Sequence, residues 1–232
     1  SKWSWAAIAI KTPIAFAATL ILFACLLLTA SRGGLIASLI GFAVFALALT
    51  AQRLKQSTLR GGVALAPVVF VIGVFALLFV RGGDDVLQRF ALASEDMEVR
   101  RTLAEAHWAL YLDRPLFGHG LNAYHELNAL AATPENWQAL SAPGSTHNIF
   151  IQVLEETGLA GLALWVLMLA TPVTRALARI VRGQRGIEWA AAAFAATTLL
   201  LLHGLVDFAL QIPAIAALFA YILGASVGRA DR

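Results

Sequence analysis

The chain has 232 residues, of which 59% are hydrophobic and 13% charged, and its mean hydropathy is +0.76. This composition excludes a disordered chain and is too apolar for a soluble enzyme domain, because soluble domains contain about 45 to 50% apolar residues. The net charge of +3 does not indicate nucleic-acid binding, because 11 of the 17 basic residues lie in or next to the chain ends and short connections on the predicted cytoplasmic side, where orientation in the membrane explains them.

Six segments are apolar enough and long enough to be membrane-spanning helices. A hydrocarbon core about 30 Å thick requires about 20 helical residues at about 1.5 Å each. An uninterrupted helix from Pro13 to Leu49 would be about 56 Å long, so we expect the chain to break at Gly33 and Gly34. The predicted spans are approximately residues 13–30, 35–50, 61–80, 158–177, 189–206 and 213–227.

A polar segment, residues 81–147, separates the third predicted span from the fourth. We therefore predict an all-α fold, in which residues 1–232 form one polytopic transmembrane bundle of about six helices and residues 81–147 form a large helical loop inserted into it. If this loop lies on the outer side, 11 of the 17 lysines and arginines lie on the cytoplasmic side, as the positive-inside rule requires.

Arg32 lies in the very short turn between the first two predicted spans, on the side where basic residues are least expected. A charge in the membrane costs about 2.5 to 3.5 kcal/mol at mid-helix and less near the interface, so such residues often mark a functional site. An arginine that reaches the lipid headgroups beside a Gly-Gly turn is an equally good explanation.

The first part of the loop, residues 94–112, is predicted to be a helix that ends before Pro115. Its first turn would contain three acidic residues, which the helix dipole favours there: Glu95, Asp96 and Glu98. Arg100 and His107 are seven residues apart and would share one face, whereas Arg101 would lie on the neighbouring stripe. Ion pairs four residues apart within the helix are the simpler explanation of these arginines.

The end of the loop, residues 145–148, predicts a helix start with a hydroxyl cap. Along this helix Asn148, Gln152 and Glu156 are each four residues apart, so they form a polar stripe with His147 at its mouth. We expect the stripe to face protein or water, because it would be costly against lipid. Hydrogen bonding between helices is the alternative role of these side chains.

His203 and Asp207 are four residues apart near the outer end of the fifth predicted span, which favours a structural hydrogen bond between them. We expect no metal site, because His119 and His125 are six residues apart and the only cysteine, Cys25, lies in an apolar segment. No nucleophile elbow and no phosphate-binding glycine loop is present.

What remains is a set of arginines, histidines and carboxylates near one outer membrane face. The fork of an arginine guanidinium suits a phosphate or diphosphate group. A histidine or a carboxylate can take the proton of an attacking hydroxyl.

Four motifs, in this order and with this sidedness, resemble the O-antigen ligase and O-antigen polymerase family, specifically the C-terminal portion of its membrane domain. They are Ser31-Arg32-Gly33-Gly34, then Arg100 placed 15 residues before the first residue of Pro115-Leu116-Phe117-Gly118-His119-Gly120, then His147 to Gly158, and finally His203 to Phe208 with Ile212-Pro213.

The resemblance implies a multi-pass glycosyltransferase of the bacterial inner membrane whose active site faces the periplasm, which makes residues 81–147 a periplasmic loop. Its donor would be a glycan on undecaprenyl diphosphate, and its acceptor lipid A-core for a ligase, another lipid-linked glycan for a polymerase, or a protein. Besides these substrates and the membrane lipids, the resemblance implies no cofactor, metal or nucleic acid.

Several residue roles are carried over by motif. Arg32 would bind the diphosphate together with a second arginine, either Arg100 or Arg101. The choice between these two stays open because the aromatic residue that often lies four positions after the loop arginine is Ala104 in this chain. His147 would be the base and Glu156 would orient or support the site. Other supporting residues would be Asn148, Gln152, His203 and Asp207.

Two other classes of protein remain open. A transporter or a flippase for lipid-linked glycans would also carry a polar stripe and broken helices, but it would place ionisable groups near the middle of several spans and form no glycosidic bond. An inactive scaffold is the third possibility.

Overall fold

The computed structural model describes residues 17–18, 21–22, 24–26, 29, 31–55, 73, 83–141 and 144–228, with the side chains of Arg32, of residues 52–55 and of residues 83–96 outside this description. Every regular element in these ranges is a helix, and they contain no strand. The predicted all-α class is therefore confirmed for the described part of the chain.

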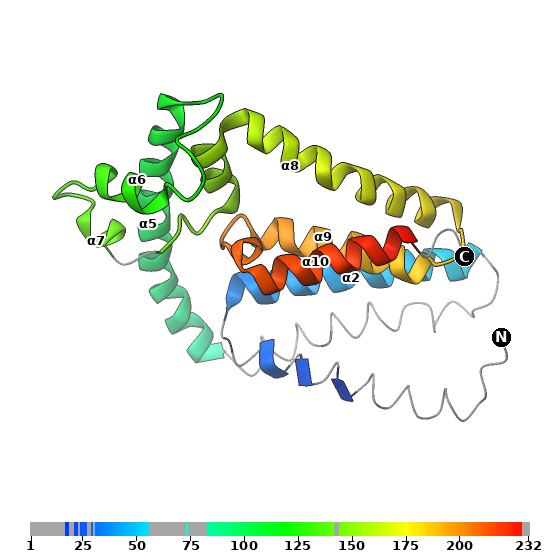
Figure 1. Ribbon diagram of the computed structural model, residues 1–232. Helices are drawn as coiled ribbons and strands as arrows, with labels where there is room; N and C mark the ends of the chain where they lie inside the picture. The colour runs from blue at the N-terminus through cyan, green and yellow to red at the C-terminus, as the bar shows by residue number, and fades with distance from the viewer. Residues whose placement is uncertain are drawn as a thin grey trace.

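Three helices lie side by side and form the body of the molecule (Figure 1). They are α2 (Arg32–Lys55), α9 (Ile187–His203) and α10 (Pro213–Gly228). The short 3-10 helix η1 (Ala209–Gln211) connects α9 to α10. The central helix, α9, contacts both neighbours, and its alanine-rich surface is buried, which lets the helix backbones approach closely.

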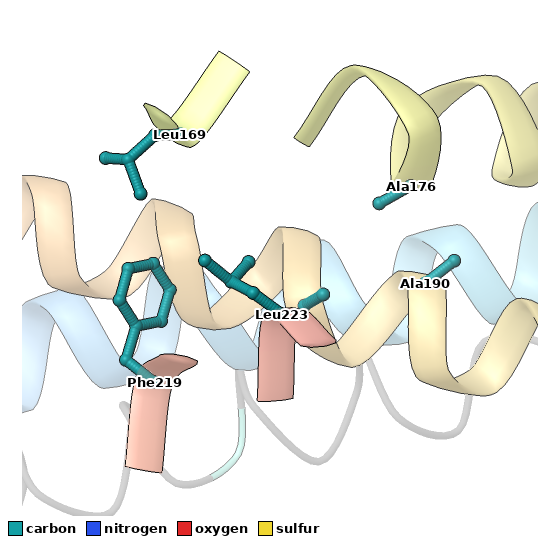
Figure 2. Close-up of a cluster of buried hydrophobic side chains, with 6 residues drawn as sticks. Leu169, Ala176, Ala190, Phe219 and Leu223 are labelled. Carbon is teal, nitrogen blue, oxygen red and sulfur yellow. The ribbon is translucent and has the colours of Figure 1, made fainter. Parts of the chain in front are cut away.

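The long helix α8 (Ile149–Arg182) packs against α9 and α10 and diverges from them toward one end of the bundle (Figure 1). Leu169 and Ala176 of α8 meet Ala190 of α9 and Phe219 and Leu223 of α10 in a buried apolar cluster (Figure 2). In a water-soluble protein, burying an apolar side chain of leucine or phenylalanine size stabilises the fold by about 1.5–3 kcal/mol. Between membrane helices, close van der Waals packing supplies the attraction instead.

An apolar groove of about 630 Å³ opens between α8 and α10. Its described lining, which includes Trp165, Met168 and Phe219, contains no acidic, basic or hydroxyl side chain. The described lining of the groove therefore offers no side chain for acid–base chemistry or for holding an anion.

The membrane spans are confirmed in part. By length and composition, residues 33–51 of α2 and the whole of α8 could cross a membrane, while α9 and α10 are apolar but shorter. Most of the first predicted span, 13–30, and all of the third, 61–80, except Gly73, lie outside the described residues. The six-span bundle therefore stays a prediction.

The inserted loop forms a small helical subdomain at one end of the bundle (Figure 1). It consists of α5 (Gly83–Asp113), α6 (Tyr124–Ala131) and α7 (Trp137–Leu140). Helix α5 ends before Pro115, as predicted, but it begins eleven residues earlier than expected. The prediction that Glu95, Asp96 and Glu98 occupy its first turn is therefore wrong, because the acidic pair Asp84 and Asp85 stands there instead.

Candidate functional site

The predicted site residues come from four elements that meet where α9 ends. His203 is the last residue of α9, and the start of α2 lies against it, since a Cβ atom added to Gly33 would be 3.8 Å from His203 Nδ1. Ser31 caps α2 by accepting a hydrogen bond from the Gly34 amide at 3.1 Å. This brings the first predicted motif, 31–34, to the last one, although about 170 residues separate them in the chain. Arg32 begins α2, but its side chain lies outside the described residues.

His147 occupies a tight turn immediately before α8. Its φ of 50° lies in the left-handed region, which costs a non-glycine residue roughly 1–2 kcal/mol. The turn is held by Thr146 Oγ1, which donates to the Asn148 carbonyl at 2.7 Å, and by the His147 amide, which donates to Ser145 Oγ at 3.3 Å. Ser145 and Thr146 are both 1% exposed, so buried hydroxyl groups fix the direction of the histidine.

Asn148, rather than a hydroxyl residue, caps α8. Its Oδ1 accepts hydrogen bonds from the amides of Phe150 and Ile151 at 3.0 and 3.2 Å. The predicted hydroxyl cap is wrong, because the hydroxyls of the segment are used inside the turn instead. The Ile149 amide donates to the Gly204 carbonyl at 2.9 Å, so the start of α8 is joined directly to the end of α9.

The His147 ring lies edge-on against Phe208, with ring centroids 5.4 Å apart. Burial lowers the pKa of His147 below its ordinary value of 6.5, the positive charge of Arg100 lowers it further, and the negative charge of Asp207 opposes them. The imidazole is therefore mainly neutral near pH 7, which is the form that can accept a proton.

The structure separates the two candidate arginines. Arg100 Nη1 donates to the Val206 carbonyl at 2.6 Å, which brings its guanidinium to the connection after α9. Arg101 Nε donates to Glu105 at 2.8 Å on the exposed surface of its own helix, as the predicted pairing within the helix requires. Only Arg100 of the two is therefore brought to the cluster around His147.

The predicted contact between His203 and Asp207 is present, with His203 Nε2 3.2 Å from Asp207 Oδ2. The other carboxylate oxygen of Asp207 accepts from the Phe208 amide at 2.7 Å. His203 Nδ1 is buried and has no hydrogen-bond partner among the described residues.

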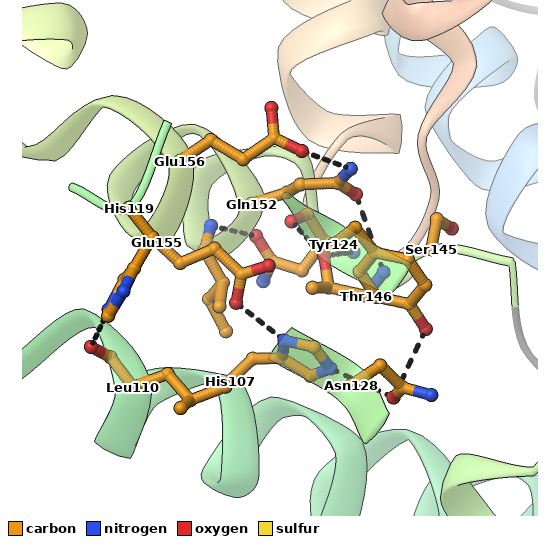
Figure 3. A network of polar contacts seen from close by, with 12 residues as sticks. His107, Leu110, His119, Tyr124, Asn128, Ser145, Thr146, Gln152, Glu155 and Glu156 are labelled. Carbon is orange, nitrogen blue, oxygen red and sulfur yellow. Dashed lines mark hydrogen bonds and ion pairs between the residues drawn. The ribbon is translucent and has the colours of Figure 1, made fainter. Parts of the chain in front are cut away.

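The polar stripe of α8 is also present. Gln152 Nε2 donates to Glu156 Oε1 at 3.1 Å, and Gln152 Oε1 accepts from the Thr146 amide at 3.4 Å (Figure 3). Gln152 is buried, so it connects the half-buried Glu156 to the turn that holds His147. The stripe faces protein, as expected.

Helix α8 is broken at Gly158, whose φ of 65° and ψ of −168° are not helical. The break leaves backbone groups without partners inside the helix, and a loop segment, residues 115–120, supplies them. The amides of His119 and Gly120 donate to the carbonyls of Glu155 and Glu156, both at 2.8 Å. In return, the amides of residues 159 and 160 donate to the carbonyls of residues 115 and 116 at 2.8 and 3.0 Å. We call this set of four hydrogen bonds the backbone brace.

Two glycines make the brace possible. A Cβ atom on Gly118 would lie 2.4 Å from the Glu156 carbonyl carbon, and one on Gly158 would lie 2.4 Å from the Leu116 carbonyl carbon. The second and third motifs found in the sequence are thus two halves of one contact.

The most deeply buried polar pair of the described region was not predicted; it is formed by His107 of α5 and Glu155 of α8. Their Nδ1 and Oε2 atoms are 2.5 Å apart, and both side chains are 0% exposed (Figure 3). The one available signal was the spacing of His107 seven residues after Arg100. Glu155 lies beside the predicted stripe and gave no signal of its own.

The described residues contain no group of three histidine, cysteine or acidic side chains that could hold a metal ion. His147 can take part in proton transfer, and the guanidinium of Arg100 can bind an anion.

A protein-family model for the O-antigen ligase matches residues 17–166, which is more than half of the chain and contains both halves of the backbone brace, Arg100 and His147. No curated protein and no solved structure matches the chain.

Proposed function

The chain belongs to the O-antigen ligase family, and from this premise we propose that it is a glycosyltransferase that moves a glycan from undecaprenyl diphosphate to an acceptor hydroxyl. Members of this family are membrane enzymes of the ligase or polymerase type. The observation that carries the proposal is the convergence of a conformationally fixed His147, whose pKa burial and Arg100 lower, with Arg100 and Asp207 where α5, α8 and α9 meet.

In the proposed reaction His147 accepts the proton of the acceptor hydroxyl while the oxygen attacks the first carbon of the donor sugar. The bond from this carbon to the diphosphate oxygen breaks, and the diphosphate leaves with the electron pair. Asp207 stabilises the imidazolium that forms, because its negative charge already favours the protonated ring. The products are a new glycosidic bond, undecaprenyl diphosphate and a proton held by His147.

Arg100 is the proposed diphosphate ligand. One of its five N–H donors is used on the Val206 carbonyl, and the guanidinium is exposed, so its remaining donors can reach an anion. A fixed cation at the leaving group lowers the barrier because negative charge develops there in the transition state. Arg32, in the first turn of α2 beside His203, is the proposed second cation.

The remaining residues of the site would support the proposed base and the proposed diphosphate ligands. Asn148 fixes the start of α8, and Gln152 with Glu156 supports the turn that carries His147. His203 and Asp207 form one hydrogen-bonded pair, and the charge of Asp207 acts on the ring of His147.

We place this end of the bundle on the periplasmic side of the bacterial inner membrane. The support is the charge at the opposite end of α8, where Arg179 and Arg182 stand in the last turn and Arg185 follows. Basic residues in short connections favour the cytoplasmic side.

The test uses the purified full-length protein in sealed lipid vesicles with a labelled glycan on undecaprenyl diphosphate. Lipid A-core and a second lipid-linked glycan are offered as separate acceptors. We expect label to move to one of them, which distinguishes ligase from polymerase, and the His147→Ala variant to transfer none. Movement of the donor across the bilayer without a new glycosidic bond on any acceptor, protein included, would identify a flippase instead and refute the proposal.

A further inference from the structure

Helix α5 and the first turns of α8 run in the same direction and meet at two levels. At one level His107 contacts Glu155, and at the other the charge of Arg100 reaches His147. Arg100 and His107 are seven residues apart on α5, and His147 and Glu155 are eight residues apart at the start of α8. At about 1.5 Å per helical residue, the two levels are about 10 to 12 Å apart on each side. A shift of α5 at the first level therefore moves Arg100 relative to His147 at the second.

The contact at the first level is held firmly from the side of α5. His107 Nε2 lies 3.2 Å from Asn128 Oδ1, and Asn128 in turn donates to the Leu140 carbonyl at 2.8 Å. Tyr124 stacks on the imidazole, with ring centroids 5.0 Å apart. The ring of His107 is thus fixed by α6 and by the end of α7. Its position therefore determines where Glu155 of α8 can make the contact.

Burial makes this contact hard to break. Neither side chain is exposed, so a carboxylate that lost its histidine would be left with little compensation from water. The second carboxylate oxygen of Glu155 already has no hydrogen-bond partner among the described residues. His107 is therefore the principal partner that the structure gives this carboxylate.

We propose that His107 and Glu155 are positioning residues, whose buried contact sets the register of α5 against α8 and so holds Arg100 beside His147. Only the catalytic consequence rests on the proposed function, because the placement of Arg100 is a property of the fold. The backbone brace joins the same two parts of the chain, but it acts on the loop after α5 and not on the turn that carries Arg100.

The placement of Arg100 can be read from the titration of His147. The charged groups that act on His147 are Arg100 from α5 and Asp207 from the connection after α9. Glu155 faces His107 from α5, His119 from the loop and Glu156 from its own helix. Since the positive charge of Arg100 lowers the pKa of His147, withdrawal of Arg100 raises it.

The experiment compares wild type with Glu155→Gln in nanodiscs. Histidine labelled with ¹³C is titrated by NMR, and the signal of His147 is assigned with His147→Gln. We expect Glu155→Gln to raise the pKa of His147. Removal of the Glu155 charge by itself would lower that pKa, because it removes a negative charge, so a rise reports the movement of Arg100.

Two further variants complete the cycle. In Arg100→Gln the pKa of His147 should rise, and adding Glu155→Gln should raise it no further. Glu105→Gln is the matched control, because it removes an exposed carboxylate of α5 that pairs with Arg101 and not with α8, and it should give no rise. Glu155→Asp, which keeps the charge but shortens the reach, should shift the pKa upward if Glu155→Gln does not fold.

An unchanged or lowered pKa of His147 in folded Glu155→Gln or Glu155→Asp overturns the proposal. Because NMR does not depend on transfer, the two proposals can fail separately. A rise without any glycan transfer by wild type would leave the positioning role standing and refute the function. Glycan transfer by wild type without a rise in the pKa of His147 in the Glu155 variants would support the function and refute the positioning role.

Discussion

Replacing Gly158 by alanine should destabilise the junction between the loop subdomain and α8. The residue has a φ of 65° and a ψ of −168°, a combination that is almost restricted to glycine and costs other residues about 1–3 kcal/mol. The new Cβ atom would also lie 2.4 Å from the backbone of Leu116, which no side-chain rotation can relieve.

The size of the effect follows from what must separate. Moving the 115–116 backbone away breaks the two hydrogen bonds donated by the amides of residues 159 and 160, each worth about 0.5–1.5 kcal/mol. Together with the backbone strain, we expect a loss of about 2 to 6 kcal/mol. This is a large share of the stability of a typical domain.

The assay is denaturant unfolding of the protein in detergent, combined with protease cleavage of the 114–121 loop under native conditions. The matched control is Gly224→Ala, because Gly224 is helical, has no positive φ and has nothing within 4 Å of an added Cβ atom. We expect the control to change stability by no more than about 1 kcal/mol. If Gly158→Ala unfolds like wild type and its loop stays protected, the backbone brace does not hold the junction.

Four further outcomes are expected. His147→Gln should lower glycan transfer by about 10²- to 10⁴-fold, the usual contribution of a general base, measured with the labelled donor. Arg100→Ala should lower transfer by about 10²- to 10³-fold while Arg101→Ala stays near wild type; equal losses would contradict the assignment of Arg100. Transfer should fall with pH below 6.5, and Asp207→Asn, which removes the charge that raises the pKa of His147, should move this limb of the pH profile to lower pH. Asn148→Ala should lower the stability of α8 by about 0.5 to 2 kcal/mol in the same unfolding assay, with Ser141→Ala as a control, because Ser141 caps α7 through its backbone amide and not through its side chain.

The parts of the site that were predicted correctly depend on short spacings. Arg101 and Glu105 are four residues apart on one helix and are neighbours whatever the rest of the fold does, so this pair was found. His203 and Asp207 also contact one another as predicted, although α9 ends at His203 and Asp207 lies in the connection that follows it. Apolar content likewise predicted a helix over 35–50 and the helical segments within α8, α9 and α10.

The parts that were missed depend on which helix lies beside which. His107 and Glu155 are 48 residues apart, and no periodicity indicates that a buried histidine of the loop meets the acid beside the polar stripe. The cap of α8 was misassigned for a related reason, since the hydroxyl of Thr146 is used on the Asn148 carbonyl within a left-handed turn. The start of α5 was placed too late because Ser94 followed by three acidic residues has the pattern of a helix start, whereas the helix begins at Gly83.

The backbone brace has a consequence for hybrid proteins. Because residues 115–120 complete the hydrogen bonding of residues 155–160, the inserted loop cannot be exchanged between family members independently of the start of α8. A chimera intended to transplant acceptor preference should take both segments from the same parent. Its crossover points then belong before α5 and after residue 160, inside the regular part of α8.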